Sequence, residues 1–124
     1  AIKEKVIVLY ESNYRRNFIH IDDVCRCFKY SLDNYPKMKN NIYNLGLSSA
    51  NMTKKELCDE IKKQINDFEY IFSEIGKDPD SRDYLVSNKK IEKVGFKTKY
   101  SLAHGISDLK KLYSFLDPKM FSNY

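Results

Sequence analysis

The sequence predicts one α/β domain, or an α+β arrangement for the chain in isolation, with short strands alternating with about four helices. Short β-branched or aromatic runs alternate with segments whose apolar residues recur every three to four positions, as in strands followed by amphipathic helices. The chain has 124 residues, which is enough for one hydrophobic core. Its composition, 42% hydrophobic and 31% charged with four glycines and three prolines, is that of a folded domain.

Two strands and a helix are expected in the first third of the chain. Residues 5–10 form a β-branched run, and residues 15–21 read as a second extended segment. An aspartate, Asp22 or Asp23, is expected to cap the helix that follows, because its carboxylate accepts a bond from a free backbone N–H. The apolar stripe of that helix is formed by residues spaced four apart: Val24, Phe28 and Leu32.

The middle of the chain is expected to contain a loop, a strand, a helix and another strand. Residues 35–40 read as a loop and residues 41–46 as a short strand. Thr53 and Glu56 form a capping box, in which each side chain satisfies the backbone N–H of the other residue. The helix that they open has apolar residues at helical spacing: Leu57, Ile61 and Ile65. Residues 69–72 are expected to form the next strand.

A minimal strand and two helices are expected in the last third. The strand covers residues 84–86, and Ser87 or Asn88 caps a short helix after it. Gly95 ends that helix, because glycine tolerates left-handed backbone geometry. Ser101 starts the final helix, whose apolar residues recur at helical spacing.

Residues 1–116 are expected to form a single region, followed by a frayed tail at residues 117–124. No apolar run approaches the roughly 18 residues that a membrane span needs, and the N-terminus lacks the apolar core of a signal peptide. The three cysteines lack metal-ligand spacing and are expected to be buried, reduced thiols in a cytoplasmic protein: Cys25, Cys27 and Cys58.

The net charge of +5 raises the question of an anionic partner. The lysines are scattered among acids in helical stretches, which is typical of a solvated face rather than of a nucleic-acid site. A positive potential of this size still favours an anionic small molecule.

Arg16 and Arg82 are the strongest candidates for a binding site. Each lies at the edge of an apolar strand that runs into a helix cap. A guanidinium binds two phosphate oxygens through parallel charge-assisted hydrogen bonds, which lysine cannot do. On composition alone, a surface arginine is more often solvated or ion-paired, so these two residues indicate phosphate binding without proving it.

Other patterns carry no chemistry that the sequence supports. His20 and His104 are expected to be structural, since they lie far apart in the sequence without an acidic cluster, and no metal site is predicted. Tyr35 and Lys39 have the spacing of a catalytic tyrosine–lysine pair, but Pro36 breaks the helix that would align them. The chain has no glycine-rich phosphate loop after a strand, so no catalytic or cofactor-binding residue is predicted.

Five motifs, taken in order, closely resemble the C-terminal part of the extended short-chain dehydrogenase/reductases, the NAD(P)-dependent nucleotide-sugar epimerases and dehydratases. The resemblance covers nearly the whole chain, and several linked motifs make it more specific than any one alone. They are RNFIHIDDV at residues 16–24, IYNLG at 42–46, TKKEL at 53–57, DPDSRDYLVSNKKI at 78–91 and GF at 95–96.

In that family an N-terminal Rossmann domain binds NAD or NADP and carries the catalytic tyrosine and lysine, while a smaller C-terminal region holds the nucleotide-diphospho-sugar. The resemblance implies that Arg16 contacts the diphosphate and that Phe18 lies beside the base or ribose. It places Asp80 near the ribose. Lys77 stands where many relatives have a phosphate-binding arginine, and Arg82 is a nearby alternative contact.

The cofactor-binding half of the family has no counterpart in this sequence, so no turnover is expected from the chain alone. In relatives the helix after Asp23 and the strand ending at Gly46 pack onto the Rossmann sheet, so here they are expected to expose apolar surface. Self-association into a homo-oligomer is the expected result. Two alternatives stay open: a small basic module that binds nucleic acid or protein, and a purely structural or dimerisation fragment.

Overall fold

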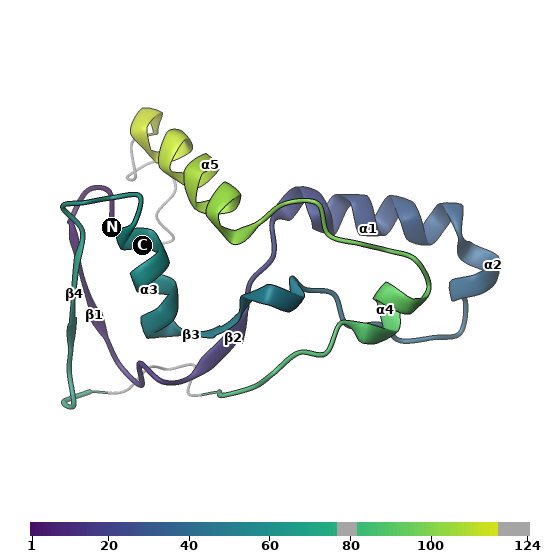
Figure 1. The fold of residues 1–124 in the computed structure, drawn as a ribbon, viewed down its shortest axis with the longest axis horizontal. Coiled ribbons are helices and arrows are strands. Elements are labelled where there is room, and N and C mark those ends of the chain that lie inside the picture. Colours follow the sequence, from purple (N-terminus) through teal and green to yellow (C-terminus); the bar gives the residue numbers. More distant parts are fainter. Residues whose placement is uncertain (77–81, 117–124) are drawn as a thin grey trace.

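The computed structural model describes residues 1–76 and 82–116, and these residues form an α/β arrangement of short strands and five α-helices. In chain order the elements are β1 (Val6–Leu9), β2 (Arg15–Asn17), α1 (Ile21–Asp33), α2 (Tyr35–Met38), the 3₁₀ turn η1 (Ser48–Ala50), β3 (Asn51–Thr53), α3 (Lys54–Lys62), β4 (Glu69–Phe72), α4 (Lys89–Lys93) and α5 (Leu102–Phe115). The body is elongated, with β1, β4 and α3 at one end, α1, α2 and α4 at the other, and β2 and β3 between them (Figure 1).

The first end of the molecule is a two-stranded parallel sheet covered by α3. β1 pairs with β4 in the register Val6 to Glu69, and the core beneath them is formed by Leu9, Cys58, Ile65 and Phe68. The predicted capping box is confirmed at the start of α3. The Thr53 hydroxyl accepts a bond from the Glu56 N–H at 3.1 Å, and the Glu56 carboxylate accepts one from the Thr53 N–H at 2.7 Å.

The other end is a helical cluster. Its core is formed by Cys27, Met38, Ile91 and Phe96, which come from α1, α2, α4 and the residues just after α4. Gly95 has φ +107° and ends α4, which confirms the predicted left-handed stop. The Tyr30 hydroxyl donates to the Val94 carbonyl at 2.7 Å and so fastens α1 to this turn.

Three of the expected local structures differ from the structure. Residues 41–46 and 84–86 form no strand, because the described chain supplies no backbone ladder beside them. Residues 35–40, expected as a loop, contain the one-turn helix α2, whose first turn accommodates Pro36. The exposed Cys25 also departs from the prediction of three buried thiols.

The cap of α1 is His20 rather than an aspartate. His20 Nδ1 accepts the Asp22 N–H at 3.1 Å. Asp23 is instead fully buried and joins α1 to the segment before α5. Its carboxylate accepts the Lys99 N–H at 2.9 Å and the Tyr100 N–H at 3.0 Å, and it forms an ion pair with Arg26. Burial raises the pKa of Asp23, but the hydrogen bonds from Tyr100, Lys99 and Arg26 outweigh it and leave the pKa below its usual value.

The apolar stripe of α1 faces solvent, as expected from the resemblance. Phe28 is 70% exposed and Leu32 is 75% exposed, whereas Cys27 on the opposite side is buried. Ile42, in the segment that follows α2, is 89% exposed. Among the described residues, no helix is both long and apolar enough to cross a membrane.

Replacing Asp23 with asparagine should destabilise the fold. The amide cannot accept all the bonds now made to the carboxylate, and Arg26 loses its counter-ion. We expect a loss of about 3 kcal/mol in the free energy of unfolding, measured by urea denaturation. Because the folded pKa of Asp23 is lowered, its contribution is present above the unfolded pKa of about 4 and is lost as the pH falls below it.

Asp33→Asn is the matched control, because it removes the same charge from an exposed position of the same helix. We expect it to change the free energy of unfolding by less than about 0.5 kcal/mol. Equal losses in both variants would show that the buried carboxylate has no special role.

Candidate functional site

A bidentate ion pair holds β2 against the segment of residues 82–86. The Arg15 guanidinium donates to both carboxylate oxygens of Asp83, from Nε and Nη2, at 3.0 Å each. The Arg15 backbone N–H donates to the same carboxylate at 2.8 Å. These bonds, those of the Arg15 side chain first, lower the pKa of Asp83 to about 2. Two segments 68 residues apart in the chain therefore meet at a carboxylate that stays charged at neutral pH.

A second tie comes from β3. The Asn51 side chain accepts the Val86 N–H and donates to the Val86 carbonyl, both at 2.9 Å. The Asn51 amide thus makes with the Val86 backbone the two hydrogen bonds that a neighbouring strand would otherwise make. Since β3 is paired antiparallel with β2, residues 82–86 lie along this small sheet although they form no strand themselves.

Arg16 lies at the junction of these segments. Its guanidinium carbon is 5.2 Å from the centre of the Tyr84 ring, and its Nη1 donates to the Arg15 carbonyl at 2.8 Å. The aromatic face thus supports the flat side of the guanidinium. The structure therefore brings Arg16 beside the exposed segment that carries Arg82.

Behind β2, Asn17 fixes the strand against residues 46–47. Its amide donates to the Leu47 carbonyl at 2.9 Å. A Cβ at Gly46 would lie 1.7 Å from Asn17 Oδ1, so only glycine fits at this contact. Asn88, which is 2% exposed, borders the same space, because its Nδ2 would lie 3.2 Å from that Cβ. This close packing sets the position of the residue next to Arg16.

The remaining predicted site residues are placed differently. Phe18 lines an apolar groove of about 870 Å³ between α3, α5 and the N-terminal residues. Lys77 and Asp80 lie outside the described residues.

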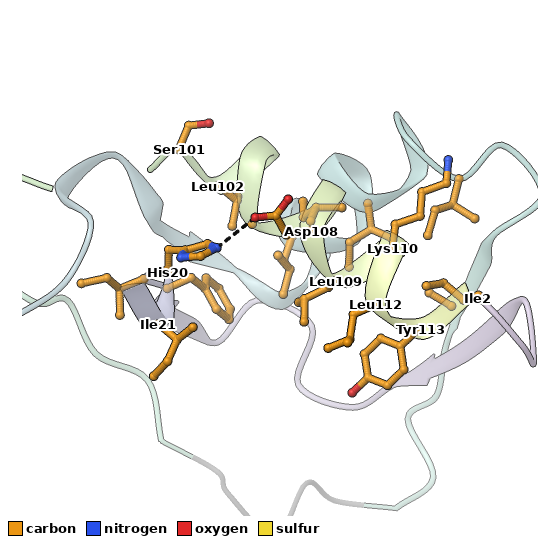
Figure 2. A pocket seen from close by; sticks show the side chains of 18 of the residues that line it. Ile2, His20, Ile21, Ser101, Leu102, Asp108, Leu109, Lys110, Leu112 and Tyr113 are labelled. Carbon is orange, nitrogen blue, oxygen red and sulfur yellow. Dashed lines mark ion pairs between the residues drawn. The ribbon is translucent and has the colours of Figure 1, made fainter. Parts of the chain in front are cut away.

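His20 and Asp108 line this groove side by side (Figure 2), and His104 approaches the same carboxylate. His20 Nε2 lies 3.5 Å and His104 Nε2 3.1 Å from Asp108 Oδ2. The prediction that neither histidine has acidic groups around it is therefore wrong, and the two residues meet although they are far apart in the sequence. The chain brings them together because α5 begins beside His20: Tyr100 stacks on His20 with ring centres 4.6 Å apart, and Gly105 lies against the His20 ring.

No model of a known protein family matches the chain. A curated relative is a probable GDP-L-fucose synthase 1 from Oryza sativa subsp. japonica, which is 26% identical over 109 residues, 88% of this chain and 32% of that protein. The structure of a GDP-mannoheptose C4 reductase from Campylobacter jejuni with NADP bound has a TM-score of 0.69 at 26% identity, covering 90% of this chain and 33% of that one.

The fold recurs in a GDP-6-OMe-4-keto-L-xylo-heptose reductase from Campylobacter jejuni, with a TM-score of 0.74 at 24% identity over 90% of this chain and 34% of that one. The chain is therefore similar to a part of nucleotide-sugar enzymes of the extended short-chain dehydrogenase/reductase family. It spans about a third of the length of these relatives.

Two features of the candidate site were not predicted from the sequence: the Arg15–Asp83 ion pair and the histidine cluster. Arg15 and Asp83, each adjacent to a predicted site arginine, have opposite charges, and that complementarity was the available signal. The histidine cluster gave a weaker signal, the spacing of four between His104 and Asp108 on one predicted helix.

Replacing Asp83 with asparagine should release residues 82–86 from β2. We expect faster amide hydrogen exchange at Tyr84 and Val86, because the amide cannot bind the Arg15 guanidinium at both oxygens. In the wild type, lowering the pH should produce the same release only as the pH approaches 2, since the folded pKa of Asp83 is about 2 and lies below its unfolded value. Asp33→Asn serves as the control, and unchanged exchange in Asp83→Asn would contradict the tie.

Proposed function

We propose that this chain is the nucleotide-diphospho-sugar-binding portion of an NADP-dependent enzyme, and that its nucleotide is GDP. The observation that carries this proposal is the convergence of Arg16 and the Arg82 segment at one small sheet. A guanidinium can bind two phosphate oxygens at once, so two arginines near a surface fixed by an ion pair and the Asn51 amide are suited to a diphosphate.

The division of roles follows the resemblance. Arg16 would bind the diphosphate, with Arg82 or Lys77 closing over it. Asp80 would lie near the ribose, and Phe18 beside the base or ribose. Tyr84 is an addition from the structure, since its ring supports the Arg16 guanidinium.

The choice of GDP and NADP rests on the relatives. The curated relative and three of the similar solved structures are named for GDP-linked sugars, and two of these structures hold NADP or NADPH. A fourth, at 22% identity, is a dTDP-glucose 4,6-dehydratase with NAD. The whole protein would then oxidise, epimerise, dehydrate or reduce the sugar by hydride transfer in the synthesis of a glycan precursor. The cofactor and the catalytic tyrosine and lysine would be held by the part of the family that this chain does not match, so we expect no turnover from this chain alone.

A nucleic-acid-binding module is disfavoured by the arrangement of the charges. Along α3 and the turn after it, Lys55, Lys62 and Lys63 each form an ion pair with a neighbouring acid, and Lys29 on α1 does the same. Such pairs neutralise the positive residues locally and leave no continuous basic stripe on these helices.

Replacing Arg16 with alanine should weaken the binding of GDP-mannose at least tenfold. Loss of one charge-assisted contact to phosphate is worth about 1.5–3 kcal/mol, and 1.4 kcal/mol corresponds to a factor of ten. The measurement is a heteronuclear NMR titration with GDP-mannose, UDP-glucose and dTDP-glucose, in which shifts at residues 15–17 and 82–86 report the site. Arg16→Lys should recover only part of the affinity, because lysine cannot bind two oxygens in parallel.

Lys29→Ala is the control for net charge, since Lys29 lies on the exposed face of α1 away from β2. We expect it to bind GDP-mannose like the wild type. The proposal fails if no nucleotide sugar gives a saturable shift, or if Lys29→Ala weakens binding as much as Arg16→Ala.

The exposed apolar face of α1, formed by Phe28 and Leu32, would be covered by the cofactor-binding part in the whole enzyme and would drive self-association of the chain alone. We expect sedimentation velocity to show a mass that increases with concentration, and Phe28→Ser with Leu32→Ser to reduce that increase. Ile75→Ser is the control, because Ile75 is even more exposed but lies after β4. A monodisperse monomer at high concentration would refute the self-association.

A further inference from the structure

Three potential metal ligands converge from two parts of the chain. Two of them, His20 and Asp108, line the apolar groove (Figure 2). His20 lies immediately before α1, while His104 and Asp108 are four residues apart on one face of α5. One ligand atom from each residue lies within 4.8 Å of the other two. The position of α5 that creates this convergence is fixed by the bonds from Lys99 and Tyr100 to buried Asp23.

We propose that His20, His104 and Asp108 form a binding site for a divalent transition-metal ion, with Zn²⁺ as the ion. Two imidazoles and a carboxylate are the donor set that zinc takes in three-ligand sites, where water fills the fourth position. When zinc is bound tetrahedrally with zinc–ligand distances of about 2.0–2.1 Å, neighbouring ligand atoms lie about 3.3 Å apart. The two separations from Asp108 Oδ2, 3.5 Å to His20 and 3.1 Å to His104, already match this spacing.

The third separation is that between the two histidines, and movement of one side chain can shorten it to the value that zinc needs. The His104 side chain is 49% exposed at the surface of α5, so it can rotate toward His20 without disturbing the core. His20 itself is held in place, since its side chain is only 11% exposed and stacks on Tyr100. One rigid ligand and one adjustable ligand therefore face the shared carboxylate.

The charges around the cluster favour a cation. Asp108 supplies one negative charge to the site, and Asp22 Oδ2 lies 3.9 Å from the other nitrogen of His20. Two lysines are near: Lys111 lies 3.6 Å from the other oxygen of Asp108, Oδ1, and Lys99 lies over the Tyr100 ring. The Lys111 side chain is 72% exposed and can leave Asp108 for solvent when an ion binds.

Metal binding would change the tautomer of His20. His20 Nδ1 now accepts the Asp22 N–H, so the neutral ring carries its proton on Nε2. A metal ion at Nε2 requires that this proton leave to solvent and that Nδ1 take one up. The Asp22 carboxylate would then accept the bond from Nδ1–H, which is the usual partner of a metal-bound histidine. The ring remains neutral, and the site exchanges a helix-cap bond for a carboxylate bond.

The test is isothermal titration calorimetry, in which zinc sulfate is added to the full chain at neutral pH. We expect one ion per chain, with binding weakened at least tenfold in His104→Gln and in Asp108→Asn. Both side chains are more than 40% exposed, so these variants should keep the fold, which circular dichroism checks. Asp33→Asn is the matched control, because it removes the same charge from an exposed helical position with the same spacing to its partner.

A second readout separates a metal ligand from a merely structural histidine. Long-range nitrogen–proton NMR of the imidazoles should show His20 protonated on Nε2 before zinc and on Nδ1 after it. Cys25→Ser excludes binding by the exposed thiol and should leave the affinity unchanged. The proposal is overturned if His104→Gln and Asp108→Asn bind zinc like the wild type, if Cys25→Ser abolishes binding, or if the His20 tautomer does not change.

Discussion

The buried carboxylate of Asp23 is the constraint on which the arrangement of the second half of the chain depends. It binds two consecutive backbone N–H groups, of Lys99 and Tyr100, and so fixes where the chain leaves α4 and enters α5. A buried charge is tolerated only when its hydrogen-bonding capacity is filled, and Arg26 supplies the remaining charge. Because α5 starts immediately after this contact, the groove and the His20 cluster inherit their geometry from it.

Local signals in the sequence predicted the elements well. The capping box at Thr53, the glycine stop at Gly95 and the start of the last helix at Ser101 all depend on residues within four positions of one another. The strand expected at residues 41–46 depends on a neighbour far away in the chain, and no such neighbour occurs among the residues described. A strand needs a partner for its backbone groups, so a local pattern alone could not decide it.

The candidate site shows the same division between local and distant information. Arg16 was identified from the chemistry of its side chain and from its motif, yet the interaction that positions its strand is made by the neighbouring pair, Arg15 and Asp83. Their pairing joins residues 68 positions apart, which no local pattern reveals. Asp22 or Asp23 was expected to cap α1, since aspartate is common at that position, but His20 occupies the cap, and the Asp23 carboxylate makes the distant bonds instead.

The link between the two ends of the molecule is polar, whereas each end has its own small apolar core. The link consists of the β2–β3 ladder, the Arg15 ion pair and the Asn51 amide, all at least partly exposed. Exposed polar contacts of this kind contribute little to stability individually, so the link is the part of the fold that an additional interaction would order most. An anion bound at Arg16 would sit directly on this link. Ordering the two ends relative to each other costs conformational entropy, which would reduce the observed affinity for the anion. The affinity would therefore be higher if the rest of the protein already held the two ends in place.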